Sequence, residues 1–178
     1  MHHAFADTEK DPHSPKYSAN PFTMLMETKD VYFSILNKEK EVEPRFTRNV
    51  PEWASFDKFA NAWLVRMLWG AFYVWFYMQF ATATWMYALL PIHLFMAPVH
   101  GTIVNWYAHK YGYRSYEMSN TATNLLPLDL LMMGESYHNN HHKNDSSPNF
   151  GSRWHELDPT YYIILLLNFL GIIQVKKS

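Results

Sequence analysis

The fold is decided by the stretch MLWGAFYVWFYMQFATATWMYALLPIHLFMAPVHGTIVNWYAH, residues 67–109, which contains no Asp, Glu, Lys or Arg. A helix rises about 1.5 Å per residue, so a stretch of this length can cross a hydrocarbon core of about 30 Å twice. The pattern predicts two transmembrane helices, at about 60–81 and 85–107, joined by the turn ATATW. The alternative is a buried helical hairpin in a soluble protein, but such hairpins usually carry a charged face.

The charges on either side of this hairpin predict its orientation. Every Lys and Arg precedes residue 67 or follows residue 109. By the positive-inside rule we expect both flanks, and with them both termini, on the cytoplasmic side and the turn on the opposite side. Trp63, Trp85 and Trp106 fall near the ends of the expected spans, where tryptophans often lie at the membrane interface.

The composition excludes several classes of protein. The 15 Lys and Arg residues are balanced by 16 Asp and Glu, so no basic excess points to nucleic acid. The chain has no cysteine, which excludes disulfides, iron–sulfur clusters and thiolate zinc sites. Its 178 residues fit one domain, with an expected cytoplasmic segment at 1–58, two spans at 60–107 and a second cytoplasmic segment at 108–178.

The remaining segments predict short helices and loops, so the fold class is all-α: an integral membrane hairpin with a cytoplasmic helical cap. Residues 23–49 indicate short helices, and RNVPEWASFDKFAN predicts a helix that enters the first span with Pro51 in its first turn. NLLPLDLLMM, residues 124–133, predicts a short apolar helix. TYYIILLLNFLGII, residues 160–173, predicts a helix too short to span, lying at the membrane surface or against the core.

The expected topology brings six imidazoles from three distant segments to one side of the membrane. In GESYHNNHH, residues 134–142, the three histidines share one helical face because they are spaced i, i+3 and i+4. Neutral imidazole suits iron, copper or zinc, and more than four candidate nitrogens suit two metals better than one tetrahedral zinc. The six are His2, His3, His109, His138, His141 and His142.

The alternative for such residues is a histidine-rich surface or core histidines satisfied by hydrogen bonds. We prefer that interpretation for His13, His93, His100 and His155, which lie outside these clusters in the sequence.

Three stretches carry a family resemblance: HHAFADTEKDPHSP, NWYAHKYGYRSY and MGESYHNNHH, in this order around the hairpin. With WHELDPTYY before an apolar tail, the chain resembles the membrane fatty acyl-CoA desaturases of the stearoyl-CoA delta-9 type over nearly its whole length. The HxxHH pattern alone would also suit alkane and sterol hydroxylases. Asn105, four residues before His109, and the DPHSP segment favour the desaturases.

The resemblance implies a di-iron centre held by histidine boxes and two neighbouring residues. It implies that the family's additional histidine lies after the hairpin, and that an asparagine four residues earlier approaches one metal through a water molecule. The matching positions are His2 and His3 for the end of the middle box, Asn105 and His109 for the asparagine and the additional histidine, and His138, His141 and His142 for the last box.

The first box of the family, HxxxxH, and the first histidine of its middle box have no counterpart in these 178 residues. The chain therefore resembles the C-terminal portion of a desaturase. We expect the codons upstream of Met1 to encode His-Arg and, further upstream, an HxxxxH box beside another hairpin. We also expect the 178-residue chain by itself to have no desaturase activity.

The activity that the resemblance implies is an oxygen-dependent desaturation that introduces a cis double bond near the middle of a saturated acyl-CoA chain, in unsaturated fatty acid biosynthesis. Unactivated methylene groups need an oxidant that no side chain supplies, which is why iron and O2 are implied. An external electron donor of the cytochrome b5, ferredoxin or rubredoxin type is also implied. The alternatives are a membrane lipid hydroxylase and a non-catalytic metal-binding membrane protein, and no substrate-binding residue is assigned.

Ligand imidazoles need hydrogen-bond acceptors for their second nitrogen, and carboxylates are common partners. Each candidate carboxylate could instead be a helix cap or a solvated charge. The candidates are Asp7, Glu9, Asp11, Glu135, Glu156 and Asp158.

Overall fold

The structure, a computed structural model, describes residues 1–11, 13–48 and 53–175. Every regular element of secondary structure within these ranges is a helix, and strand-like pairing there is limited to one bridge between Tyr113 and Asn124. The all-α prediction is confirmed. The chain divides into two compact units, Met1–Glu41 with His100–Ser178, and Val42–Val99, and each is described by itself.

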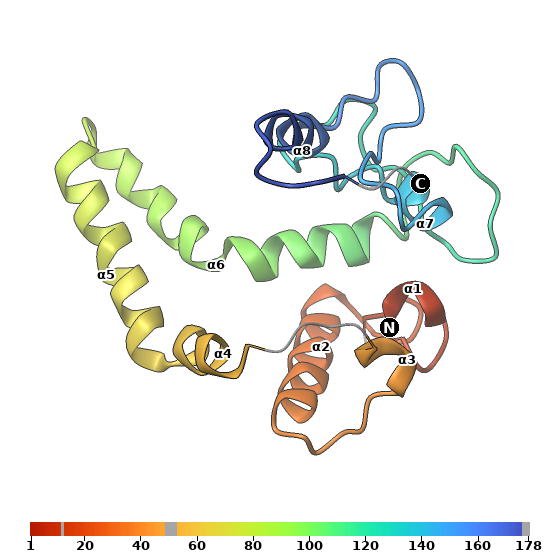
Figure 1. Ribbon diagram of the computed structural model, residues 1–178, viewed down its shortest axis with the longest axis horizontal. Helices are drawn as coiled ribbons and strands as arrows, with labels where there is room; N and C mark the ends of the chain where they lie inside the picture. The colour runs from red at the N-terminus through yellow and green to blue at the C-terminus, as the bar shows by residue number, and fades with distance from the viewer. Residues whose placement is uncertain (12, 49–52, 176–178) are drawn as a thin grey trace. The chain divides into compact units, whose positions relative to one another are not determined.

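The first unit holds most of the histidines. Asn20 caps one of its longer helices by accepting a hydrogen bond from the Thr23 N–H, and Asp158 caps another by accepting from the Tyr161 N–H. Proline follows each cap at the first helical position, where its missing N–H costs nothing. The helices are α1 (His2–Phe5), α2 (Pro21–Leu36), the π-helix η2 (Ile103–Tyr107), α7 (His138–Lys143) and α8 (Pro159–Phe169) (Figure 1).

The second unit contains the hairpin that the uncharged stretch predicted. The hydroxyl of Tyr77 and Nδ1 of His93 lie 3.0 Å apart, which joins the two arms. The helix predicted before the first span is present, whereas Pro51 lies outside the described residues. The elements are α3 (Pro44–Thr47), α4 (Ala54–Asn61), α5 (Trp63–Phe80), the 3₁₀-helix η1 (Thr84–Ala88) and α6 (Leu89–Thr102), whose last residues belong to the first unit (Figure 1).

One helix in the described ranges is long and apolar enough to cross a membrane, Thr84–Tyr107, which comprises η1, α6 and η2. It coincides with the second predicted span. The first predicted span forms α5, of 18 residues, but Arg66, Gln79 and the many Trp and Tyr residues of this helix lower its mean hydropathy. Length and composition thus support the second span, and the membrane hairpin as a whole stays a prediction.

The short apolar helix predicted at 124–133 is wrong. This segment is an irregular loop in which the carboxylate of Asp129 accepts hydrogen bonds from the backbone N–H groups of Met132, Gly134 and Ser136. Such side-chain bonds compete with the helical backbone pattern. The loop then turns at Met133 and Gly134, whose φ angles are 58° and 98°, and left-handed backbone of this kind cannot continue a helix.

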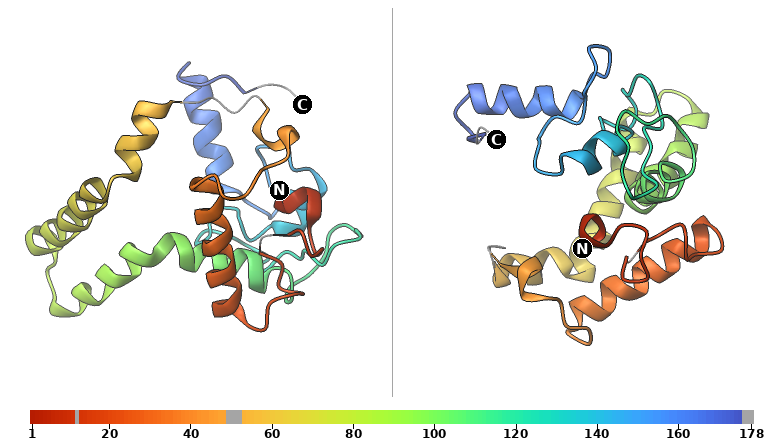
Figure 2. Two further views of the ribbon diagram at one scale, coloured as in Figure 1. Left: turned by 90° about the horizontal axis from the view of Figure 1, so that it is seen from below. Right: turned by 90° about the vertical axis from the view of Figure 1, so that its right-hand side faces the viewer.

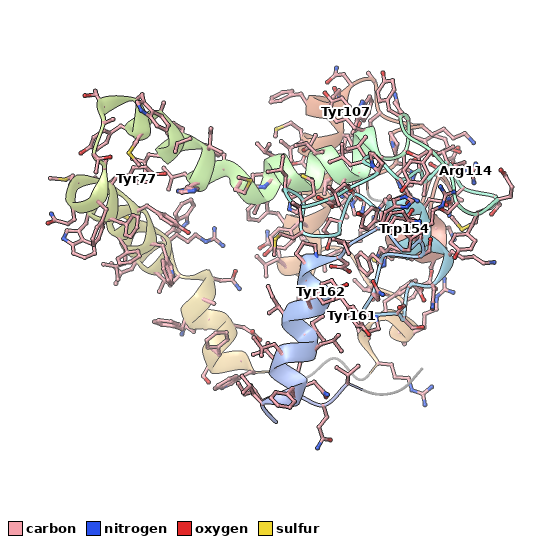
Figure 3. All side chains as sticks on the ribbon, turned by 90° about the horizontal axis from the view of Figure 1, so that it is seen from above. Tyr77, Tyr107, Arg114, Trp154, Tyr161 and Tyr162 are labelled. Carbon is pink, nitrogen blue, oxygen red and sulfur yellow. The ribbon has the colours of Figure 1, made fainter. Side chains whose placement is uncertain are left out.

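The interior of the first unit is built largely from polar side chains, because this unit consists mostly of loops around the short helix α7. Loops buried in this way must find hydrogen-bond partners for their backbone groups. Most of the largest fully buried side chains are polar: Asn124, Asp129, Ser136 and Asn139, beside Tyr137 and Met24. Helix α8 extends away from these loops, with Tyr161 and Tyr162 in its first turn (Figures 2 and 3).

Candidate metal centre

Four imidazoles from three segments meet beside α7. Nε2 of His138 lies 3.0 Å from Nε2 of His109, two residues after η2, and 3.0 Å from Nε2 of His142. Nε2 of His142 in turn lies 3.1 Å from Nε2 of His2 in α1. The ligand atoms of these four residues all lie within 4.8 Å of one another, which is compact enough to hold a metal ion. We call them the histidine quartet.

The other two predicted histidines form a pair next to the quartet. Nε2 of His3 and Nε2 of His141 are 3.1 Å apart. The ring of His3 also stacks on that of His142, with 4.5 Å between the ring centroids. The structure therefore brings all six histidines predicted from the sequence together, as a quartet and a neighbouring pair.

The second ring nitrogens of two quartet members face oxygen acceptors. Nδ1 of His2 lies 2.9 Å from Oδ1 of Asp11. Nδ1 of His109 lies 3.1 Å from the Thr121 hydroxyl oxygen, which donates in turn to the Asp7 carboxylate at 3.1 Å. When Nδ1 carries the hydrogen, the lone pair of each imidazole is on Nε2, so His2 and His109 both direct a lone pair into the quartet.

The Nδ1 atoms of His142, His138 and His141 do not face an oxygen acceptor. Nδ1 of His142 faces the side-chain amide nitrogen of Asn120 at 3.3 Å. Nδ1 of His138 and Nδ1 of His141 are buried and have no hydrogen-bond partner within the described parts of the chain. Buried polar atoms of this kind are rare in folded proteins and often mark functional positions.

Burial favours the neutral form of four histidines of the site, His109, His138, His141 and His142. Burial, together with the neighbouring imidazoles, lowers the pKa of His109 and of His141 to about 4 and that of His142 to about 2. Burial also places the pKa of His138 well below its usual value. Neutral imidazole is the form that binds metal ions, so the site is preorganised for a cation.

A second group lies beside the quartet and includes a histidine that we had interpreted as structural. Ligand atoms of His2, Asp11 and His13 lie within 4.8 Å of one another, and the rings of His2 and His13 are 4.5 Å apart. This group uses Nδ1 of His2, which already faces Asp11 at 2.9 Å. A neutral imidazole has one lone pair for a metal. With its Nδ1 hydrogen directed at Asp11, His2 offers Nε2 to the quartet, and the ring of His13 packs beside its ring. Burial would raise the pKa of Asp11, but hydrogen bonds from His2, His13 and Asp7 lower it.

The other predicted residues, all within the described ranges, form no hydrogen bond with these imidazoles. The side-chain amide of Asn105 donates to the backbone carbonyl of Gly101 at 2.8 Å, one turn earlier. Glu9 is exposed. Glu135 is half-buried beside a cavity of about 260 Å³ that His141 also lines. Glu156 and Asp158 bind backbone groups and other side chains in place of imidazoles.

The histidines interpreted as structural have varied surroundings. His93 pairs with Tyr77, as expected for a satisfied histidine. His155 lies edge-on to Trp154, with ring centroids 5.3 Å apart. His100 differs, because its Nε2 is buried without a hydrogen-bond partner among the residues that the structure describes.

Several residues around the site were not predicted from the sequence. Thr121 and Asn120 contact quartet imidazoles from a loop that also contains Arg114, whose side chain donates to the carbonyls of Met118 and Asn120 (Figure 3). The available signal was weak, since single polar residues in a loop have no diagnostic spacing. Asn139 and Asn140 separate the histidines of HNNHH and are both buried, and their position within this motif was the stronger signal.

Comparison with known proteins agrees with this geometry. The family model for fatty acid desaturases matches residues 1–166. The chain is 31% identical, over 99% of its length, to a delta-9 desaturase-like protein of Arabidopsis thaliana, of which it covers 57%. It is 32% identical to an sn-1 stearoyl-lipid 9-desaturase of Synechocystis and 28% identical to an acyl-CoA 5-desaturase of Anemone leveillei, again over 99% of this chain and 53% of each relative.

The chain thus spans a little over half the length of these curated relatives. No solved structure matches it. The resemblance noted in the sequence is confirmed by the family match over most of the chain, and the histidine cluster is one that could hold a metal. The chain belongs to the fatty acid desaturase family.

Proposed function

We propose that the chain provides part of a di-iron active site that uses O2 to introduce a cis double bond near the middle of a saturated fatty acyl chain. The observation that carries this proposal is the convergence of Nε2 atoms from α1, the segment after η2, and α7. Three segments separated by up to 140 positions in the chain meet there. Relatives named as desaturases support the reaction type.

The donor set fits iron. Neutral imidazoles suit first-row transition metals, and the quartet directs the lone pairs of His2 and His109 to one point. The histidine pair next to it offers further nitrogen ligands, which favours a second iron. When bound, iron would activate O2, and O2 would be the oxidant that the removal of hydrogen from unactivated carbon requires.

The protein's own residues would hold and orient this centre. The quartet and the pair would provide the ligands, with Asn105 acting through a water molecule. Asp11 would fix the ring of His2, and Thr121 with Asp7 would fix the ring of His109. Three of the four quartet imidazoles are buried, so bulk water has little access to the ligand nitrogens.

Substrate, membrane and electron donor complete the proposal. We propose an acyl-CoA substrate, in line with the name of the Anemone leveillei relative. The Synechocystis relative is named for a stearoyl-lipid substrate, so a lipid-linked chain is the alternative to test. We further propose that the protein is a multi-pass membrane protein with its histidines and both termini on the cytoplasmic side. An external donor of the cytochrome b5, ferredoxin or rubredoxin type would dock on that side.

Metal binding by the 178-residue chain is the first test. The chain, purified in detergent and titrated anaerobically with Fe(II), should bind about two irons, because six imidazoles exceed the capacity of one site. Metal content is measured by mass spectrometry after gel filtration. Firm binding of zinc, with exclusion of iron and no oxygen-dependent activity, would instead favour the non-catalytic alternative.

The reaction is tested in a chimera, in which this chain replaces the aligned half of the Synechocystis sn-1 stearoyl-lipid 9-desaturase. A desaturase-deficient host that expresses the chimera should accumulate monoenes with a mid-chain cis bond, identified by mass spectrometry of the fatty acids. Labelled stearoyl-CoA and labelled lipid, supplied to isolated membranes, distinguish the two carriers. Hydroxy acids without monoenes would establish a lipid hydroxylase in place of a desaturase. The unmodified chain is the parallel sample, for which the sequence predicts no product.

A further inference from the structure

Glu156 has a buried carboxylate that lies on the side of α7 away from the histidines. Glu156 is 4% exposed and lies between α7 and α8. Its Oε1 accepts the hydroxyl hydrogen of Tyr113 at 2.6 Å. Its Oε2 accepts from the backbone N–H groups of Ser152 and Arg153, from the Ser152 hydroxyl and from the side-chain amide of Asn140, at 2.7 to 2.9 Å. Burial raises the pKa of Glu156, but these hydrogen bonds outweigh it and lower the pKa to about 2.

Asn140 connects this carboxylate to α7 itself. Its side-chain amide nitrogen donates to Glu156 at 2.8 Å and to the backbone carbonyl of Phe150 at 2.9 Å. Its side-chain oxygen accepts from the amide of Asn124 at 2.9 Å. The oxygen of Asn124 in turn accepts the backbone N–H groups of Asn139 and Asn140, at 3.0 and 3.2 Å. Each polar atom of the Asn140 side chain is therefore used.

Asn139 fixes the same helix to a second loop. Its side-chain oxygen accepts the backbone N–H groups of Ser115 and Tyr116 at 2.9 and 2.8 Å. Its amide nitrogen donates to the carbonyls of Tyr116 and Ala122, both at 3.0 Å. The two asparagines lie on the face of α7 opposite the histidines, because residues 139 and 140 point away from positions 138, 141 and 142.

Two glycines allow the loops to approach this closely. A Cβ atom at Gly151 would collide with the backbone carbonyl of Glu156, and one at Gly112 would collide with the backbone carbonyl of Asn124. Gly112 also has a φ of 126°, which other residues rarely adopt. The loops on both sides of α7 are thus packed backbone to backbone around Asn124, Asn140 and Glu156.

A six-residue helix cannot fix its own orientation. Isolated helices of this length are unstable in water, so contacts with the rest of the protein must determine where α7 lies. Rotation of α7 about its axis would redirect three imidazoles at once. It would also leave the buried groups of Asn140 and Glu156 without partners, and unsatisfied buried polar groups destabilise a fold.

We propose that Glu156 is a positioning residue of the metal centre, which fixes the rotation of α7 through Asn140 and so aims the imidazoles of His138, His141 and His142. Asn124 and Asn139 complete the same frame. The inference rests on the metal-binding function proposed above. It assigns the two asparagines of HNNHH a role that is as specific as that of the histidines beside them.

The test uses the full chain with Co(II) as the probe, because the visible absorption of Co(II) reports ligand number and geometry. Glu156→Ala should weaken Co(II) binding at least about tenfold and change the Co(II) spectrum. Glu156→Gln keeps an acceptor oxygen for Asn140 and Ser152 and should restore most of the affinity and the parental spectrum. The matched control is Asn20→Ala, which removes the cap of α2 in the same unit but contacts no histidine, and should leave the spectrum unchanged.

Hydrogen exchange of the α7 amides in the metal-free chain provides a second readout. Protection of residues 141–143 should fall in Glu156→Ala and remain in Asn20→Ala. A folded Glu156→Ala protein with parental Co(II) affinity, spectrum and exchange would overturn the proposal. If Glu156→Ala does not fold, Tyr113→Phe decides, because it removes one donor to the carboxylate: a shifted spectrum supports the proposal and an identical one refutes it.

The two proposals fail in different ways. If the parental chain binds no Co(II), the metal-binding function fails, and the exchange of α7 still decides whether Glu156 positions the helix.

Discussion

His138 and His142 each contact two other imidazoles through Nε2, so the quartet is a chain of nitrogens that runs from His109 to His2. Replacement of His138 by Ala removes an internal member of this chain. We expect His138→Ala to weaken metal binding by more than about 100-fold. Loss of a residue that only hydrogen-bonds to a ligand typically costs about 10- to 100-fold. Metal content after gel filtration measures this loss.

The matched control for this change is His93→Ala, which removes an imidazole that pairs with Tyr77 in the other unit. Metal content should stay at the parental value in this variant. Parental metal content in His138→Ala would contradict the assignment of the quartet.

The six histidines could be predicted because part of their arrangement is local. Helical spacing alone places His138, His141 and His142 on one face, and the expected topology placed His2, His3 and His109 on the same side of the membrane. Thr121 could not be predicted, because its contact with Asp7 joins residues 114 positions apart in a loop without periodicity. The approach of the His13 ring to within 4.5 Å of the His2 ring could not be predicted either, because no regular spacing links the two positions.

The loop at 124–133 depends on one carboxylate. Asp129 accepts three backbone N–H groups, two of them in buried hydrogen bonds, and its replacement by Ala would leave these groups without partners. We expect Asp129→Ala to destabilise the first unit by about 3 kcal/mol or more. Denaturation monitored by circular dichroism measures the loss. Asp30→Ala, at an exposed position of α2, should be nearly neutral, and equal stability of the two variants would refute this role for Asp129.

This loop also shows why its helix prediction failed. The apolar run around Asp129 has the composition of a helix, and composition carries most of the weight in a short segment. The carboxylate outweighs it because three simultaneous hydrogen bonds to the backbone fix a turn, and Gly134 continues that turn in a left-handed conformation. By contrast, α5, α6 and α8 could be predicted well, because long apolar runs need no distant partner to form helices.

The turn between α5 and η1 tests the proposed membrane topology. Thr82 is exposed in this turn, and the chain has no cysteine of its own, so Thr82→Cys introduces a single reactive thiol. Because Lys and Arg flank the hairpin and are absent from the turn, we expect an impermeant maleimide to label this thiol from outside intact cells. A cysteine that replaces Ser146, in a polar loop of the C-terminal flank, should be labelled only after the cells are lysed. The reverse pattern would overturn the topology.

The buried histidines predict how the stability of the whole protein depends on pH. Folding lowers the pKa of His109 and His141 from 6.5 to about 4, so the unfolded chain binds more protons than the folded chain between these values. Stability must therefore fall as the pH drops from about 6.5 to about 4. Glu156 adds a second loss as the pH drops from its usual value of 4.5 towards 2.

Thermal midpoints of the metal-free chain at several pH values measure this dependence. The midpoint should decline steadily on acidification. His142→Gln, which removes a group whose pKa is lowered to about 2, should make the decline shallower between pH 6.5 and 4. A midpoint independent of pH over this range would show that the imidazoles are not buried in the metal-free protein.

The polar interior of the first unit, where Asn124, Asp129, Ser136 and Asn139 are fully buried, sets its response to temperature. Exposure of apolar surface raises the heat capacity on unfolding by about 0.45 cal/mol/K per Å², whereas exposure of polar surface lowers it by about 0.26. The unfolding of this unit should therefore show a heat-capacity change below the usual value of about 12 to 15 cal/mol/K per residue. Its stability curve should be correspondingly flat, so that cooling weakens the scaffold of the imidazoles less than it weakens an ordinary apolar core.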